Sequence, residues 1–196
     1  MIRNDVLSFF RAWAGDPGRV GAIAPSGTAL AEIITREITP GDAPVIELGA
    51  GTGVFTQALL DRGLREQDLT LVESGPEFAA MLARRFPRAR VLHLDAAALN
   101  RYDLFDGAGA GAIVSGLPLL AMPARKTIAI MKGAFGHLRN GGALYQFTYA
   151  PRCPVGRRIL DRLGLRATRI GRALLNMPPA TVYRITRRNP ARLLPE

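Results

Sequence analysis

Cysteine and histidine are scarce in this chain of 196 residues, which contains one cysteine, Cys153, and two histidines, His93 and His137. A single cysteine excludes an internal disulfide and a metal site built from cysteines, and it suits a reducing compartment. We therefore expect a cytoplasmic protein without a bound metal. His93 falls inside an expected strand and His137 ends an expected helix, so neither is placed to act as a general base.

An uninterrupted apolar segment is also lacking. The N-terminus has no signal-peptide pattern, because charged residues interrupt it. The longest uncharged run, residues 107–124, has the length of a membrane span but contains four glycines and two prolines. A buried parallel strand with the loop after it explains this run better. The sequence predicts a protein that does not span the membrane and forms one domain over residues 1–196.

Acidic side chains are few in the last quarter of the sequence. Residues 151–196 contain eleven arginines and two acids, Asp161 and Glu196, and the whole chain has a formal net charge of +10. Basic charge placed so unevenly favours a polyanionic partner, either nucleic acid or an anionic membrane. A solvated arginine-rich tail without a partner is the alternative interpretation.

Apolar strand-like segments alternate with helical patterns, as in an α/β protein with an open parallel sheet. The expected strands cover residues 44–48, 69–73, 90–94, 111–115, 143–149, 167–175 and 180–187. The expected helices cover residues 54–62, 76–86, 124–137 and 154–163. The last two strands are joined by a proline-containing turn, so we expect a seven-stranded, mostly parallel sheet with an antiparallel C-terminal hairpin.

Residues 2–14 form a further helical pattern ahead of the first strand. Apolar side chains recur there at helical spacing, and basic ones lie elsewhere on the helix. Two interpretations are open: a helix packed on the protein's own core, or an amphipathic helix lying in a membrane interface.

The segment VIELGAGTGVF joins the first strand to the next helix and contains Gly49, Ala50, Gly51 and Gly53. Glycines let the backbone approach a ligand closely because they have no Cβ. Residue 54 is valine, so the G-x-G-x-x-G fingerprint of dinucleotide sites is absent, as is a P-loop. Glu47 precedes the loop, and its carboxylate suits the ammonium group of an amino acid. This pattern points to S-adenosylmethionine (SAM) as cofactor and S-adenosylhomocysteine (SAH) as product.

Two further carboxylates end the next two strands. Glu73, followed by Ser74, is placed to accept hydrogen bonds from both ribose hydroxyls, and Asp95, followed by Ala96, to hold the adenine amino group. One such acid is common as a helix cap, whereas three at the carboxyl ends of successive strands are rare by chance. The sequence predicts a Rossmann-like class I SAM-dependent methyltransferase.

Several segments together resemble the bacterial soluble-type phospholipid N-methyltransferases over nearly the whole chain. They are GRVGAIAPSGTALA at 18–31, VIELGAGTGVFTQAL, VSGLP, and QFTYAPRCPV at 146–155. Those enzymes methylate phosphatidylethanolamine stepwise, through the mono- and dimethyl lipids, toward phosphatidylcholine. The resemblance implies these lipids and anionic membrane lipids as partners, no nucleic acid, and a peripheral position on the inner face of the cytoplasmic membrane.

The resemblance also assigns roles to residues 1–40, ahead of a Rossmann-like core over 41–196. The N-terminal helix would engage anionic membrane, through Phe9, Phe10, Trp13, Arg3 and Arg11. The GAIAPS segment would close over the methionine end of the cofactor, through Gly21, Ala22, Ile23 and Ser26.

The target side is expected after the fourth strand, at Ser115-Gly116-Leu117-Pro118. Amino methyltransferases that act on bases usually carry Asn/Asp-Pro-Pro-aromatic there, in which the ring stacks on the base. This loop keeps the bend and the backbone carbonyls but lacks the amide and the ring. We expect Ser115 and Gly116 to act at the reacting centre, with Ser115 also touching the cofactor, and Leu117 and Pro118 to contact a small aliphatic amine and its apolar surroundings.

Further substrate-binding candidates follow at the same edge of the sheet. Tyr145 and Tyr149 share a face of the fifth strand, where aromatic rings can hold a methylated cation. Tyr149 is also the candidate that relays the amine proton, although a rim tyrosine packed on the sheet has the same pattern. Arg152 is placed to pair with a lipid phosphate, and Asn176 lies in the turn of the C-terminal hairpin.

Two alternatives belong to other functional classes. An enzyme similar to the ribosomal RNA adenine N6-methyltransferases would explain the arginine-rich tail, but the stacking motif is missing and only about 40 residues follow the fifth strand, too few for the helical domain of those enzymes. A SAM-responsive or membrane-bound module without catalysis would not require all three cofactor carboxylates.

Overall fold

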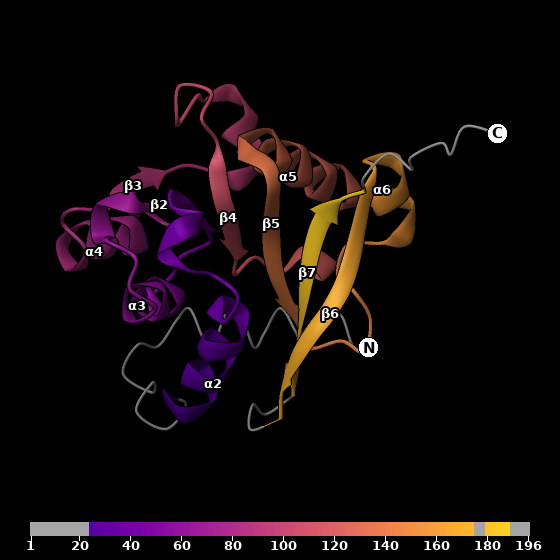
Figure 1. Ribbon diagram of the computed structural model, residues 1–196, viewed down its shortest axis with the longest axis horizontal. Helices are drawn as coiled ribbons and strands as arrows, with labels where there is room; N and C mark the ends of the chain where they lie inside the picture. Colours follow the sequence, from indigo (N-terminus) through magenta and orange to yellow (C-terminus); the bar gives the residue numbers. More distant parts are fainter. Residues whose placement is uncertain (1–23, 175–178, 189–196) are drawn as a thin grey trace.

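The computed structural model describes residues 24–174 and 179–188. They form a seven-stranded sheet of order β3-β2-β1-β4-β5-β7-β6 (Figure 1). Its strands are β1 (Val45–Leu48), β2 (Leu69–Glu73), β3 (Arg90–His93), β4 (Ala110–Ser115), β5 (Leu138–Thr148), β6 (Leu165–Ala173) and β7 (Ala180–Arg187). Strand β7 pairs antiparallel with both β5 and β6, and the other pairs are parallel. The predicted α/β fold, with its antiparallel C-terminal hairpin, is confirmed.

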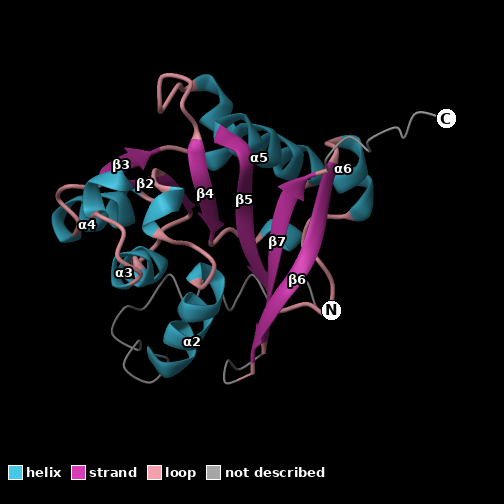
Figure 2. Cartoon of the chain, in the orientation of Figure 1, coloured by secondary structure: helices cyan, strands magenta, loops and turns pink. Residues whose placement is uncertain are grey.

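Helices cover both faces of the sheet (Figure 2). One face packs against α2 (Ala24–Thr35), α3 (Val54–Asp61) and α4 (Pro76–Arg85), and the other against α5 (Ala124–His137) and α6 (Arg157–Arg162). Short 3₁₀ helices complete the connections: η2 (Pro40–Asp42), η3 (Glu66–Asp68), η4 (Ala96–Arg101) and η5 (Leu119–Ala121). Each face has its own buried apolar core, with Ile34 and Leu59 in one and Met131 and Leu144 in the other. In the described ranges no helix combines the length and apolar character needed to cross a membrane.

The structure corrects two expectations about elements. Residues 24–35 form helix α2, which the sequence interpretation did not include, and its buried Leu30 and Ile34 pack on the sheet. Strand β5 begins at Leu138, five residues earlier than expected. A register shift opposite Ala110 lets β5 continue through Gly142, where a Cβ would lie 2.9 Å from a backbone oxygen of β4. Gly142 is therefore required by the close packing of the two strands.

The parallel strands bring their carboxyl ends to one edge of the sheet, and the site lies at this edge. Strand β1 stands between β2 and β4, where the order of the strands reverses, and such switch points open a crevice for ligands. The backbone N–H of Gly49 donates to Val72 O at 2.8 Å, and that of Gly116 donates to Leu48 O at 2.8 Å. The loops after β1 and β4 therefore lie side by side.

Several expected site residues lie outside the described residues, so their predicted roles stay predictions. They are Arg3, Phe9, Phe10, Arg11, Trp13, Gly21, Ala22, Ile23 and Asn176. Ser26 lies in the first turn of α2. Strand β7 begins at the carboxyl edge of the sheet, because Thr181 pairs with Thr148 at the end of β5.

Candidate cofactor and substrate site

The loop after β1 is shaped by glycines in the left-handed region. Gly49, Gly51 and Gly53 have φ values of 71°, 53° and 81°, which residues with a Cβ rarely adopt. Gly53 also begins α3, and a Cβ there would lie 2.5 Å from the Phe86 ring. A Cβ on Gly116 would lie 2.7 Å from Gly49 O, so the backbones of the glycine loop and the target loop approach closely.

Glu47 lies beneath this loop, with a side chain that is 1% exposed. Its Oε2 accepts a hydrogen bond of 2.6 Å from Thr56 Oγ1 on α3, and its Oε1 has no partner in the described protein. Burial raises the pKa of Glu47 to about 8, with a smaller contribution from the negative charge of Glu73. A buried acceptor oxygen without a partner fits an ammonium group delivered by a ligand, as expected for the methionine end of SAM.

Glu73 ends β2 with its carboxylate fixed by two backbone donors. Gly51 N donates to Oε2 at 2.9 Å and Gly75 N donates to Oε1 at 2.8 Å. Each oxygen keeps a second lone pair, because an ionised carboxylate accepts about four hydrogen bonds. The group is therefore held in a fixed orientation and can still accept from two vicinal hydroxyls such as those of a ribose.

Asp95 follows β3 and faces Lys126, which sequence reasoning did not identify. Its Oδ1 accepts from Ala97 N at 2.9 Å, as the cap of η4, and its Oδ2 accepts from Lys126 Nζ at 2.7 Å. The hydrogen bond from Lys126 holds the pKa of Asp95 below its usual range, with help from the Ala97 N–H. The sequence did contain an electrostatic signal for the role of Lys126. Arg125 and Lys126 occupy the first turn of α5, where the helix dipole disfavours cations.

These residues surround a cavity of about 260 Å³ at the β1–β4 switch point. The expected residues that line it are Gly49, Gly51, Glu73, Ser74, Asp95, Ala96, Gly116, Leu117 and Pro118. Phe78, Met122, Lys126 and Ile130 add walls that the sequence did not indicate. Four other expected contacts do not line the cavity and are buried: Glu47, Ala50, Gly53 and Ser115.

The target loop is held from behind by side chains of β4 and β5. Ser115 is fully buried, and its Oγ accepts from Leu117 N at 3.4 Å. Gln146 Nε2 donates to Leu117 O at 3.0 Å and to Phe147 O at 2.9 Å, leaving its buried Oε1 without a partner among the described side chains. Ser115 therefore positions the loop and is not exposed to a reacting group. The sequence analysis did not identify Gln146. Its amide binds the carbonyl of Leu117, one of the loop carbonyls that were expected to face the amine.

A second, much smaller cavity of about 20 Å³ opens on the other side of this loop and is mostly apolar. It is lined by Leu117, Pro118, Leu119, Leu120, Ala121, Phe147, Thr148, Tyr149, Ala150 and Pro154. Leu117 and Pro118 line both cavities, so they form a shared wall. The Tyr149 ring meets the Phe147 ring edge to face at 5.5 Å, which brings Tyr149 beside this wall. Arg152 follows in the loop after β5 and is exposed.

Tyr145 does not reach either cavity, in contrast to its expected role in binding substrate. It is 5% exposed, and its hydroxyl donates to Glu37 Oε2 at 3.3 Å, just beyond α2. Burial raises the pKa of Tyr145 to about 12. The reason is its position in β5: three residues before the strand ends, the side chain meets the helix packed on that face and not the open edge.

Comparison with known sequences finds a relative that matches along most of the chain. No protein-family model matches. The chain is 29% identical over 169 residues to the ornithine lipid N-methyltransferase of Singulisphaera acidiphila, covering 84% of this chain and 86% of that protein. It is 45% identical over 56 residues to an uncharacterized methyltransferase of Exiguobacterium sibiricum, but this match covers 29% of the chain and 25% of the relative.

Solved structures show the same fold at low sequence identity. The glycopeptide N-methyltransferase MtfA matches with a TM-score of 0.64 and 16% identity, covering 82% of this chain and 90% of that one. Magnesium protoporphyrin IX methyltransferase from Synechocystis, solved with SAM, matches with a TM-score of 0.63 and 14% identity, covering 92% and 90%. The predicted cofactor agrees with the ligand of that structure.

The cavity fits SAM on the chain's own geometry as well. Its left-handed glycines allow close approach of the backbone, and Glu73 keeps lone pairs in a fixed orientation. Glu47 does not line the cavity, but it offers an unpaired buried oxygen beneath the glycine loop. The chain has the fold of the class I SAM-dependent methyltransferases, and this fold, the site and the similarities together support a SAM-dependent methyltransferase.

Proposed function

We propose that the chain methylates the amine of a membrane-lipid head group, with phosphatidylethanolamine as substrate and stepwise transfer toward phosphatidylcholine. The observation that supports this most is the wall of Leu117 and Pro118 between the cofactor cavity and an apolar second cavity. A planar base would require a stacking ring and an amide after β4, and the loop has neither. An aliphatic amine attached to an apolar body matches a wall of this composition.

The protein's own groups orient the reactants across this wall. Bound SAM supplies an electrophilic methyl group, and alignment of that methyl with the amine provides much of the rate. Glu47 would hold the ammonium of the cofactor's amino acid, Glu73 would hold the ribose, and Asp95 would hold the adenine. Leu117 and Pro118, with Gln146 behind them, set the distance between the two cavities.

The target amine must lose a proton before it can accept a methyl group. An alkyl ammonium with a pKa of about 10.4 is neutral in roughly one molecule in 10³ at pH 7, a deficit of about 4–5 kcal/mol. The apolar wall lowers this deficit, because desolvation disfavours the ammonium form. The Tyr149 hydroxyl, which lines the second cavity, relays the departing proton: its oxygen accepts the proton of the ammonium while its own O–H proton passes to water.

Transfer of labelled methyl from SAM to vesicles of phosphatidylethanolamine and phosphatidylglycerol tests this function. We expect label in mono-, di- and trimethylated lipid after chromatographic separation. Tyr149→Phe keeps the ring, so kcat should fall about tenfold or more while SAM affinity stays unchanged. Absence of lipid label from a protein that still binds SAM, with transfer to RNA instead, would reject the lipid substrate.

An ornithine lipid is the second candidate, favoured by the match to the Singulisphaera enzyme. Its head group is an amino acid without a phosphate, so the two substrates differ in what Arg152 can bind. If phosphatidylethanolamine is the substrate, Arg152→Gln should raise its KM about tenfold, whereas the matched exposed variant Arg158→Gln should not. Faster transfer to an ornithine lipid, indifferent to Arg152, would select the second candidate.

A further inference from the structure

Acidic and basic side chains separate in the sequence at residue 106. Residues 24–106 contain twelve acidic and eight basic side chains, whereas residues 107–188 contain fourteen lysines and arginines and one acid, Asp161. The sheet order turns this division into a spatial one, because β3, β2 and β1 come from the first part and β4, β5, β7 and β6 from the second. Two halves of opposite net charge therefore meet at β1 and β4, where the cofactor cavity lies.

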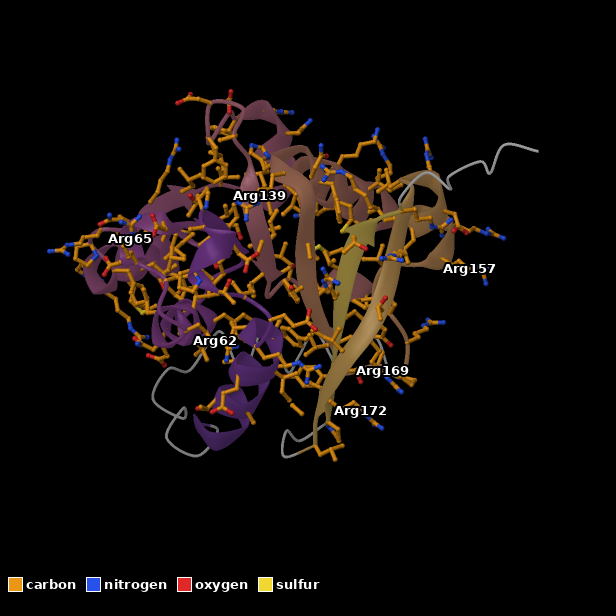
Figure 3. The ribbon with its side chains drawn as sticks, viewed as in Figure 1. Arg62, Arg65, Arg139, Arg157, Arg169 and Arg172 are labelled. Atoms are coloured by element: carbon orange, nitrogen blue, oxygen red, sulfur yellow. The ribbon has the colours of Figure 1, made fainter. Side chains whose placement is uncertain are left out.

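A β-bulge in β6 gathers two of these arginines on one face. The register shifts between Arg169 and Gly171, so Arg169 lies opposite Tyr183 and Arg172 lies opposite Thr181. Because Tyr183 and Thr181 share a face of β7, the two arginines do as well. Without the extra residue, side chains three positions apart would point to opposite faces. Figure 3 shows both on β6, whereas Arg62 and Arg65 lie on the other half.

This pair of arginines lies at the substrate edge of the sheet. Arg172 pairs with Thr181, which pairs with Thr148, a residue of the second cavity. Neighbouring strands are about 4.8 Å apart, so the Cα atoms of Arg172 and Thr148 lie within about 10 Å. Two exposed leucines border the same edge: Leu120 is 37% exposed beside the second cavity, and Leu174, directly after β6, is 68% exposed. We name Arg169, Arg172, Leu120 and Leu174 the basic rim.

We propose that the basic rim rests on an anionic phospholipid bilayer, an inference that builds on the proposed lipid substrate. The arginines pair with lipid phosphates and the leucines enter the boundary between head groups and acyl chains. The acidic half is repelled by the same surface, so the molecule is oriented with the Glu73 and Asp95 side of the cofactor cavity toward water. Among the described residues, the exposed large apolar side chains at this edge are leucines, which suit a bilayer, whereas the exposed Tyr102, a ring on which a base of RNA could stack, precedes β4, near the opposite edge.

Vesicle flotation with the full chain tests this orientation without using methyl transfer. The vesicles contain phosphatidylcholine with phosphatidylglycerol and no amine substrate, and the variant is Arg169→Gln with Arg172→Gln. Because each arginine contributes about fivefold near an anionic surface, we expect roughly 25-fold weaker binding. The matched control, Arg84→Gln with Arg88→Gln on the acidic half, removes the same charge from exposed sites and should change binding less than about threefold.

The variant Leu174→Ser distinguishes a membrane partner from a nucleic-acid partner, since it keeps every charge. It should weaken binding to vesicles several-fold and leave binding to RNA unchanged. Equal losses in the rim and control variants would overturn the proposal, as would binding of RNA in place of vesicles. Vesicle binding without any lipid methylation would reject the proposed substrate but not the proposed role of the basic rim. If the protein methylates lipid and the rim variant binds vesicles as well as the parent does, only the proposed role of the basic rim would be rejected.

Discussion

Glu47 is a residue whose burial is unfavourable for stability and useful for cofactor binding. Its pKa of about 8 in the folded protein lies above the ordinary value of 4.5. Between these pH values the unfolded chain ionises while the folded one keeps its proton, so stability falls as pH rises from 4.5 to 8. At about 1.4 kcal/mol per pH unit, the loss reaches roughly 5 kcal/mol. The carboxylate therefore reduces the stability of the cofactor-free protein above neutral pH.

Glu47→Gln should remove both the loss of stability at high pH and the contribution of this residue to cofactor binding. We expect the variant to unfold at a higher temperature than the parent at pH 8, a difference that disappears near pH 4.5, and to lose at least 100-fold in SAM affinity. Calorimetric unfolding across pH and titration with SAM measure the two quantities. Glu77→Gln, an exposed carboxyl on α4, is the control and should change neither. A parent-like stability profile in Glu47→Gln would contradict the burial argument.

Gln146 holds the substrate wall from behind, through Leu117 O. Gln146→Leu removes this bond while filling a similar volume, so Leu117 and Pro118 should lose their fixed position. We expect kcat for the lipid to fall about tenfold, with the dissociation constant of SAM changed less than about threefold. Single-turnover transfer and SAM titration separate these effects. A loss confined to SAM affinity would instead place Gln146 in cofactor binding.

Helix α2 can pack closely on the sheet because β6 has a glycine, Gly171, at the point of contact. A Cβ at Gly171 would lie 2.6 Å from Ile33 Cγ2, so α2 packs directly on the backbone of β6. Gly171→Ala should force the two apart and destabilise the protein by about 1–3 kcal/mol in urea unfolding. Gly136→Ala, in α5 with no neighbour within 4 Å of the new Cβ, should instead stabilise it by about 0.5–1 kcal/mol. Equal effects from both changes would contradict the packing argument.

Element order was predictable because each parallel strand is a short apolar segment between turn residues. The strands at 69–73 and 180–187 and the helix at 124–137 match the expected bounds to the residue. Helix α2 was missed because the segment before β1 was read through its resemblance, as a cofactor-closing stretch. In the site, the carboxylates after β1, β2 and β3 could be placed because parallel strands end at one edge. Gln146 and Lys126 could not, since their roles depend on which loops fold over them.

The whole molecule is a charge dipole whose basic end includes the rim. Salt at 1 M shortens the screening length to about 3 Å, from about 10 Å at 0.1 M. We expect the KM for anionic lipid vesicles to rise tenfold or more between these conditions, while kcat at saturating lipid changes little. SAM affinity, measured in parallel, should stay within about threefold, because the cofactor contacts lie inside a cavity. A KM independent of salt would show that long-range charge does not guide the encounter.

The division at residue 106 also has a consequence for how such enzymes diversify. All three cofactor carboxylates precede it, and Leu117, Pro118 and the basic rim follow it. Recombination at this point would exchange the half that contains the substrate wall and the basic rim and would keep the cofactor carboxylates. The exchange requires that the β1–β4 register, from Val45 opposite Ala112 to Leu48 opposite Ser115, is kept. A chimera of residues 1–106 with the second half of a related methyltransferase should therefore bind SAM and adopt the donor's substrate.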